Sequence, residues 1–269
     1  MSTIAITDPH DDRLADFVSL NDQAFRRKLE GDEFFIAEGY VAIDRLIESG
    51  HETRSVLLAP SRVARFEAQS AALHKSGVPV FVAERDVIAQ TVGFDLHRGV
   101  LASANRRVHP NVEDLARSSQ RIAVLEGLND AENLGAIARA ARALGIDGFV
   151  IDPTCTDPYS RRTVRVSMGE VLFLPIARVD KSNWPGALRQ LPAAGFEIWA
   201  MTPGENSDDL WAVPVPDRLA VMFGAEGSGL AEATMALSSK RVNIPIQPNV
   251  DSLNVGHAAA ITFAAISRP

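Results

Sequence analysis

Short apolar runs alternate with helical patterns over the second half of the chain, from about residue 121 onward. Strand-like runs lie at 121–127, 148–152, 174–179, 196–201, 218–224 and 241–246. Helical patterns lie at 132–145, 160–169, 184–195 and 230–239, and a nearly all-apolar helix that includes 257–266 ends the chain. This alternation predicts an α/β fold, with a mainly parallel sheet covered by helices on both faces.

The helical pattern at 132–145 (ENLGAIARAARALG) has one apolar side and one side with two cations. The apolar side is formed by Ile137, Ala140, Ala141 and Leu144. Such spacing is typical of a helix that lies on a sheet. Arg139 and Arg142 share the other side. The pattern alone leaves open whether these arginines form a solvated face or whether one of them points into a site.

The segment from about residue 20 to 105 predicts a smaller α/β unit. Helical patterns cover 38–50 and 61–77, and strand-like runs cover 54–60, 78–83 and 99–104. Polar residues and Pro110 then interrupt the apolar rhythm, as in an interdomain linker. The sequence therefore predicts an N-terminal domain at 1–105, a linker at 106–119 and a larger domain at 120–269.

Composition narrows the class of protein. The chain has 269 residues, of which 46% are hydrophobic and 23% charged, as in ordinary globular proteins. No apolar run approaches the roughly 20 residues that span a bilayer, and the start lacks the features of a secretory signal. The single cysteine, Cys155, excludes an internal disulfide, and the histidines lack a metal-ligand spacing. We expect a cytoplasmic protein without a metal or a membrane segment.

The net charge of −7 argues mildly against a nucleic acid partner, because phosphate binding usually leaves a basic footprint. Two local clusters of cations could still provide such a basic footprint. They are Arg26, Arg27 and Lys28 in the first domain, and Arg161, Arg162 and Arg165 further on. Taken alone, either cluster is better interpreted as solvated surface charge.

Four loops that follow predicted strands are candidates for chemistry, because ligands of parallel sheets bind beyond the carboxyl ends of the strands. They are 128–139 (LNDAENLGAIAR), 202–206 (TPGEN), 224–230 (GAEGSGL) and 247–265 (QPNVDSLNVGHAAAITFAA). Asn133 can cap the helix that follows it, and Gly135 lets the backbone approach a ligand. Glu226 stands among three glycines, and Ser252 and Asn254 precede the final helix.

The glycine-rich loop 224–230 does not match a nucleotide-binding fingerprint. Its glycines are spaced GxxGxG rather than GxGxxG, and no ribose-binding acid follows. It is not a P-loop either, because no Lys-Ser or Lys-Thr pair follows it. A nucleotide-dependent oxidoreductase is therefore disfavoured.

The combination of motifs is more specific than any one loop. Asn133 with Arg139, then 223–230 (FGAEGSGL), then 244–261 (IPIQPNVDSLNVGHAAAI) follow one another at strand ends. They resemble the three motifs of the SpoU (TrmH-like) branch of the SPOUT RNA methyltransferases, and the resemblance extends over 121–266. A further stretch, 34–50 (FFIAEGYVAIDRLIESG), is similar to the opening of the small substrate-binding domain of that family.

The resemblance implies a fold and a cofactor. It implies a C-terminal α/β knot, a deep trefoil that holds S-adenosylmethionine, preceded by a smaller α/β domain that binds RNA. It also implies a homodimer formed through the knot domain. The cofactor pocket is expected around Gly224, Ile244 and Leu253, with Thr202 nearby. The alternative explanation of Ile244 and Leu253 is simple core packing, and both explanations can hold at once.

The resemblance also implies an activity: methyl transfer, without a metal, to a ribose 2′-hydroxyl of rRNA or tRNA. The residues that match the active-site set of the family are Asn133, Arg139, Glu226, Ser252 and Asn254. A guanidinium stays protonated in proteins, so we expect Arg139 to grip a phosphate and stabilise alkoxide charge rather than act as a base. Arg142 is expected to be solvated.

Two positions depart from the family pattern. Many relatives have serine where this chain has Gly256, and His257 is unusual and receives no role. The departure at Gly256 bears on cofactor affinity more than on the chemistry. The alternative function is a catalytically inactive RNA-binding protein that retains the fold, and the sequence names neither the RNA nor the nucleotide.

Overall fold

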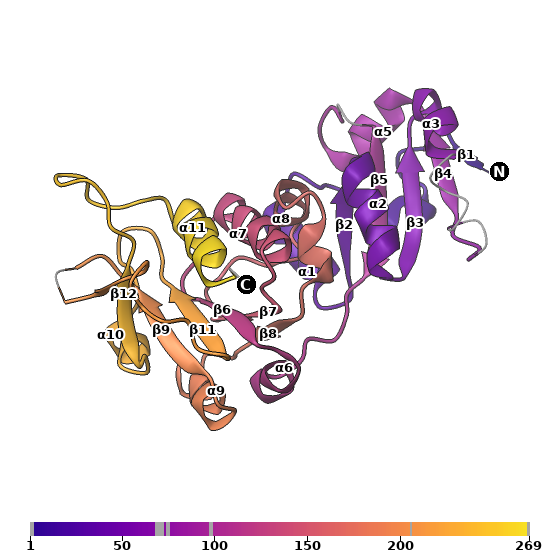
Figure 1. Ribbon diagram of the computed structural model, residues 1–269. Helices are drawn as coiled ribbons and strands as arrows, with labels where there is room; N and C mark the ends of the chain where they lie inside the picture. The colour runs from indigo at the N-terminus through magenta and orange to yellow at the C-terminus, as the bar shows by residue number, and fades with distance from the viewer. Residues whose placement is uncertain (1–2, 68–72, 74–75, 97–98, 205, 268–269) are drawn as a thin grey trace. The chain divides into compact units, whose positions relative to one another are not determined.

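The structure is a computed structural model in which the contacts divide the chain into two units (Figure 1). It describes residues 3–67, 73, 76–96, 99–204 and 206–267. The first unit contains Met1–Arg107 and Tyr159–Leu172, and the second contains Val108–Pro158 and Phe173–Pro269.

A seven-stranded sheet forms the centre of the second unit, in the order β10-β12-β9-β11-β6-β7-β8. Its strands are β6 (Arg121–Leu125), β7 (Gly148–Ile151), β8 (Ile176–Arg178), β9 (Glu197–Met201), β10 (Asp208–Asp209), β11 (Leu219–Phe223) and β12 (Lys240–Asn243). Every neighbouring pair in this sheet is parallel. The predicted parallel α/β architecture is confirmed, and each of the six predicted strands is present.

Helices cover both faces of this sheet (Figure 1). They are α6 (Val112–Ser118), α7 (Ala131–Ala143), η4 (Gly186–Arg189), α9 (Gln190–Ala193), α10 (Glu232–Met235) and α11 (Val255–Ile266). Ile122 and Val124 face the core that contains Leu115 of α6 and Leu191 of α9. On the other face, Phe223 meets Phe263 of α11 edge to face, with 5.7 Å between ring centroids. Alternate residues of each strand thus serve opposite layers.

The first unit is built on a five-stranded sheet of mixed direction, in the order β1-β4-β3-β5-β2. Its strands are β1 (Ile4–Ile6), β2 (Phe34–Glu38), β3 (Thr53–Leu58), β4 (Val80–Ala83) and β5 (Val100–Asn105). Its helices are η1 (Asp12–Phe17), α1 (Gln23–Glu30), α2 (Tyr40–Ser49), η2 (Pro60–Arg62), α3 (Val63–Glu67), α5 (Arg85–Val92) and α8 (Arg161–Val166), and η3 (Glu170–Phe173) ends where the second unit resumes. The helix predicted at 61–77 lies partly outside the described residues.

The connection between β7 and β8 folds against the first unit. Here α8 packs against β2. The ring of Tyr159 stacks on Phe35 with 4.9 Å between centroids, and Arg161 forms an ion pair with buried Glu38. These contacts explain why Tyr159–Leu172 belongs to the first unit, whereas the sequence predicts one continuous domain from residue 120.

The stretch predicted as a linker, 106–119, is not an extended connector throughout. Asn111 caps α6 by accepting a hydrogen bond from the Asp114 amide at 2.8 Å. Val112 and Leu115 are buried in the core of the second unit. A short amphipathic helix mixes polar and apolar residues, so the composition of this stretch alone does not reveal α6.

Candidate active site

Four adjacent strands of the second unit, β12, β9, β11 and β6, run in the same direction. The loops that follow them therefore gather at one edge of the sheet. These loops begin at Ile244, Thr202, Gly224 and Glu126. The loops that begin at Glu126, Gly224 and Ile244 lead into or contain the three motifs that the sequence singled out, and the remaining loop begins with Thr202.

Asn254 joins three of these segments through its side-chain amide. Its Oδ1 caps α11 by accepting from the Gly256 and His257 amides at 2.9 and 3.2 Å. Its Nδ2 donates to Oδ1 of Asn133 at 2.8 Å and to Oε1 of Glu226 at 2.6 Å. The structure thus brings together three of the five predicted active-site residues, and the capping bonds fix which end of the amide faces them.

Asn133 occupies a different place from the one that the sequence predicts. The cap of α7 is Asp130, whose carboxylate accepts from the Glu132 amide at 2.9 Å. Asn133 lies within the first turn and is 8% exposed. The prediction that Asn133 caps the helix was wrong because Asp130, three residues earlier, is an equally good capping residue. Asn133 is thereby free to accept from Asn254.

Helices α7 and α11 lie side by side and point the same way. A Cβ built on Gly256, at the start of α11, would lie 3.4 Å from the Cβ of Ala136 and 3.1 Å from Oδ1 of Asn254. At the other end, the Ser267 hydroxyl donates to the Leu144 carbonyl. A side chain at 256 would contact Asn254 and Ala136 tightly, and glycine leaves both in place.

Arg139 and Arg142 are both exposed on α7. The guanidinium of Arg142 lies 5.2 Å from the ring centroid of Phe173, so it is stacked as well as solvated. Arg139 lies one turn beyond Ala136, on the same face. Within the described part of the chain, it forms no hydrogen bond or ion pair that would occupy its guanidinium, and the structure does not join it to Asn254.

Three of the predicted cofactor residues, Thr202, Gly224 and Ile244, directly follow strands, whereas Leu253 lies next to the cap of α11. Thr202 is half-buried, and its amide donates to the Val242 carbonyl at 3.0 Å. Ile244 is half-buried, and Leu253 is 37% exposed, so neither is a fully buried core residue. Ser252 is exposed beside Leu253. Glu205, in the loop after Thr202, lies outside the described residues.

The glycine-rich loop 224–230 is closed on itself. A Cβ at Gly224 would lie 2.1 Å from the carbonyl carbon of Gly229, so no side chain fits at this position. The Gly229 amide donates to the Ala225 carbonyl at 2.9 Å. Gly227 and Gly229 have φ values of 87° and 67°, a region that favours glycine. The spacing of these glycines therefore follows from the shape of the loop.

Glu126, which the sequence reasoning missed, is buried at the base of this loop. It is 8% exposed, and Trp184 Nε1 and Thr234 Oγ1 donate to its Oε1 at 2.8 and 2.6 Å. The Ala231 amide donates to its Oε2 at 2.9 Å. A charged residue directly after a buried apolar strand was the available signal, but it was counted as part of the strand.

A second buried carboxylate supports the loop after β6. Asp152 accepts from the Gly127 amide at 3.1 Å and from the Cys155 amide at 2.8 Å. The Leu128 amide donates to Sγ of Cys155 at 3.3 Å. Burial, together with the Asp152 carboxylate, raises the pKa of the Cys155 thiol. Cys155 is therefore a structural thiol.

The two basic clusters are partly structural. Arg26 is buried, donates to Glu30 at 2.7 Å and lies over the Phe34 ring, and Arg161 is paired with Glu38. Solvated surface charge therefore does not describe these two arginines. Arg27 and Lys28 are exposed.

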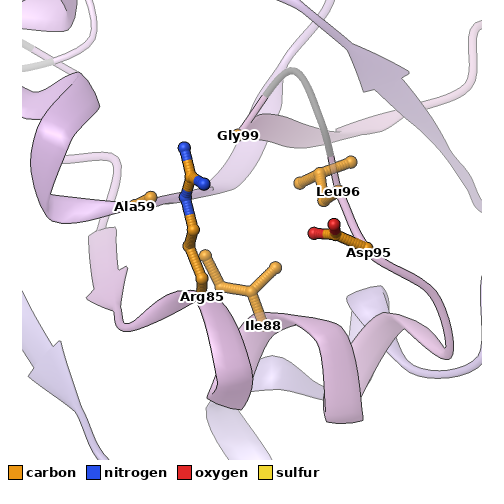
Figure 2. Close-up of a pocket in the computed structure, with 6 residues that line it drawn as sticks. All are labelled: Ala59, Arg85, Ile88, Asp95, Leu96 and Gly99. Carbon is orange, nitrogen blue, oxygen red and sulfur yellow. The ribbon is translucent and has the colours of Figure 1, made fainter.

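Figure 2 shows a small cavity in the first unit, with Arg85 and Ile88 of α5 on one side and Asp95 and Leu96 on another. Its volume is about 10 Å³, room for about one water molecule.

Within the described residues, no helix is long and apolar enough to cross a membrane, and no three His, Cys, Asp or Glu side chains are grouped to hold a metal ion.

A parallel sheet with polar side chains meeting at the carboxyl edge of adjacent strands defines an α/β protein with a site built from loops. The chain belongs to the SpoU rRNA Methylase family, whose model matches residues 120–264. The resemblance seen in the sequence is thereby confirmed.

Similar proteins extend the match over almost the whole chain. An uncharacterized tRNA/rRNA methyltransferase of Mycobacterium tuberculosis is 41% identical over 262 residues, which cover 96% of this chain and 89% of the relative. The 23S rRNA (guanosine-2′-O-)-methyltransferase RlmB of Pasteurella multocida is 28% identical, with 73% and 81% covered. The crystal structure of the AdoMet-bound rRNA methyltransferase of Sinorhizobium meliloti has a TM-score of 0.80 and 25% identity, with 98% and 97% covered.

Proposed function

We propose that this chain is an S-adenosylmethionine-dependent RNA methyltransferase that modifies a ribose 2′-hydroxyl. The observation that carries the proposal is the junction of Asn133, Glu226 and Asn254, since each comes from a different motif of the family. The similarity to RlmB, a guanosine-2′-O-methyltransferase by name, and to an AdoMet-bound rRNA methyltransferase supports the reaction type and the cofactor.

The predicted cofactor residues fit S-adenosylmethionine. The backbone around Gly224 carries no side chain that would keep an adenosyl group away. Ile244 and Leu253 retain apolar surface outside the core, which suits an adenine ring. Thr202 adds a hydroxyl at the next strand end. These four residues would hold the cofactor, which supplies a sulfonium methyl group that the RNA 2′-oxygen takes as the carbon–sulfur bond breaks.

The polar set then performs the remaining tasks. Arg139 binds the phosphate beside the target nucleotide and stabilises negative charge on the 2′-oxygen, because its guanidinium keeps its proton and has no partner among the described residues. Glu226 is the carboxylate of the set and takes the hydroxyl proton. Asn254 holds Glu226 in place, and Ser252 orients the ribose. Correct alignment of the hydroxyl supplies much of the rate.

The C-terminal segment is proposed to form the trefoil knot of the family. After β12, which lies between β10 and β9, the chain returns across the sheet edge to place α11 beside α7. This return path supports a threaded segment. A homodimer through the same unit is supported by the side of α11 that its own subunit leaves half or fully exposed. That side contains Ala260, Ile261, Ala264 and Ala265.

The first unit is proposed to bind the RNA. Arg27 and Lys28 are its exposed cations in α1, and they are available to phosphate groups. An rRNA or tRNA substrate implies that the enzyme acts in the cytoplasm.

Methyl transfer tests the proposal directly. The purified protein is incubated with labelled S-adenosylmethionine and RNA from cells that lack the gene, and the digested RNA is analysed for 2′-O-methylnucleosides. We expect label in one such nucleoside with the wild-type protein and a loss of label with Arg139→Ala. RNA binding without any methyl transfer would instead support the alternative, a catalytically inactive RNA-binding protein. Label on a base would contradict the 2′-hydroxyl as acceptor.

A further inference from the structure

We infer that Glu126 is a positioning residue that sets the shape of the glycine-rich loop 224–230 and thereby the affinity for S-adenosylmethionine. The inference rests on the proposed function, since that function assigns the cofactor to this loop. Glu126 itself stands outside the five residues that match the active-site set of the family.

The first observation is that Glu126 holds both ends of the loop. Its backbone amide donates to the Phe223 carbonyl at 2.9 Å, directly before Gly224. Its carboxylate accepts from the Ala231 amide at 2.9 Å, directly after Leu230. One residue at the end of β6 thus fixes the entry and the exit of the loop that follows the neighbouring strand β11.

The second observation is the way in which the carboxylate is buried. Glu126 is 8% exposed, and its three donors are the neutral groups of Trp184, Thr234 and Ala231. A buried carboxylate is costly unless its oxygens are hydrogen-bonded, and here both oxygens are. Hydrogen bonds to a buried carboxylate are strong and depend on their geometry. A small displacement of the loop exit would therefore weaken the bond from the Ala231 amide.

The third observation is the tight packing inside the loop. Gly224 has no room for a Cβ against Gly229 and Leu230, so the entry and the exit are already in contact. A shift of Ala231 would move Leu230 and open this contact. The same loop carries Glu226, which Asn254 holds from the other side. Loss of the Glu126 contact is therefore expected to affect the backbone near Gly224 more than the Glu226 side chain.

The test compares two variants of Glu126 with a matched control. Glu126→Ala removes all three acceptor contacts, and Glu126→Gln keeps the volume but offers one acceptor oxygen to three donors. The control is the double variant Trp184→Phe with Thr234→Val, which removes both donors to Oε1 and leaves the Ala231 contact. For each protein, we would measure S-adenosylmethionine binding by calorimetry, kcat and KM, the melting temperature, and amide hydrogen exchange.

We expect both Glu126 variants to bind S-adenosylmethionine at least about tenfold more weakly, because a charge-assisted hydrogen bond to the loop is lost. The KM for the cofactor should rise, while kcat at saturating cofactor stays within about threefold. In the Glu126 variants, amide hydrogen exchange should become faster in residues 224–231 and not elsewhere in the second unit. The control should lose stability but keep its affinity within about threefold.

The inference is overturned if the Glu126 variants bind as the wild type does, if the control loses as much affinity, or if neither Glu126 variant folds, since the residue would then serve the core alone. Failure of the proposed function gives a different result. In that case, the wild-type protein itself does not bind S-adenosylmethionine, while the exchange of 224–231 still reports whether Glu126 holds the loop.

Discussion

Asn254 and Glu226, 28 positions apart in the chain, are joined by a hydrogen bond of 2.6 Å from Nδ2 to Oε1. The orientation of the Asn254 amide is determined by its other end, because Oδ1 accepts from the amides of Gly256 and His257, the second and third residues of α11. The start of the last helix therefore dictates where the donor points. A helix cap in this protein is also part of the candidate active site.

Two variants of Asn254 separate the cap from the junction. Asn254→Asp retains an oxygen for capping but replaces the donor with an oxygen that faces Glu226 and Asn133. Asn254→Ala removes both the capping oxygen and the donor. We expect Asn254→Asp to lower kcat by at least about tenfold because a donor becomes a repelling acceptor. Asn254→Ala should in addition lose about 1 kcal/mol of unfolding free energy through loss of the cap.

Methyl-transfer kinetics and denaturant unfolding measure the two effects separately. Wild-type kcat in Asn254→Asp would remove the Asn254–Glu226 contact from the mechanism. If Asn254→Ala unfolded with the wild-type free energy, the cap would be without energetic importance.

Arg139 and Arg142 form a matched pair on one helix. Arg139→Ala should lower kcat by about 100-fold or more, because a cation that stabilises developing charge is lost. Arg139→Lys should retain part of the activity, since an ammonium keeps the charge but not the bidentate geometry. Arg142→Ala should keep kcat within about twofold and lose about 0.5–1 kcal/mol of stability through its contact with Phe173.

Steady-state methylation of one RNA substrate compares the kcat of these variants under equal conditions. Near-normal turnover in Arg139→Lys would exclude a need for bidentate phosphate contact. Full activity in Arg139→Ala would remove the residue from the mechanism.

The sequence predicted the parts of the site that have a local signal. Strand alternation predicted which loops meet, and Asn254 stands directly before an apolar helix, where a cap is expected. It did not predict that Asp130, rather than Asn133, caps α7, because both residue types suit that place. Local propensity cannot decide between two capping residues three positions apart.

The parts that could not be predicted depend on contacts between distant segments. The partners of Glu126, Trp184 and Thr234, lie 58 and 108 positions away, and no periodicity relates them. The same holds for Tyr159–Leu172, which a βαβ pattern assigns to the second unit. The ion pair between Arg161 and buried Glu38 instead favours placement of this segment in the first unit.

Cys155 is predicted to be unreactive in the folded protein. Burial and the Asp152 carboxylate raise the pKa of its thiol, so little thiolate is present at mildly alkaline pH. Alkylation by iodoacetamide, followed by mass spectrometry, should be at least about 100-fold slower in the native protein than in urea. Equal rates in the two conditions would show that the buried arrangement with Asp152 and Leu128 does not persist in solution.

The ion pair of Glu38 is predicted to stabilise the first unit. Arg161 is 26% exposed at its side chain and Glu38 only 6%, so removal of Arg161 leaves a buried carboxylate without its main partner. Arg161→Met should therefore lower the unfolding free energy by about 2–4 kcal/mol. The double variant Arg161→Met with Glu38→Gln should recover part of this loss, because the unpaired charge is gone. A double variant as unstable as the single one would mean that packing, not charge, holds α8 on β2.

His51 is predicted to make stability depend on pH. Burial, with a smaller contribution from Arg107, lowers the pKa of its imidazole from 6.5 to about 4. The ring lies between the Ser49 hydroxyl at 2.8 Å and the Tyr159 hydroxyl at 3.4 Å, and its plane is nearly perpendicular to the ring of Phe35.

The sign of the dependence follows from which state takes up the proton first. Below pH 6.5 the unfolded chain protonates His51, whereas the folded chain does so only near pH 4, so stability falls as the pH decreases through this window. His51→Gln lacks this titration. The difference in unfolding free energy between the wild type and the variant should therefore decrease as the pH is lowered from 6.5 to about 4. Urea unfolding across that range measures it. A difference that stays constant with pH would mean that the imidazole is solvated, and that the contact of Tyr159 with His51 does not bury it.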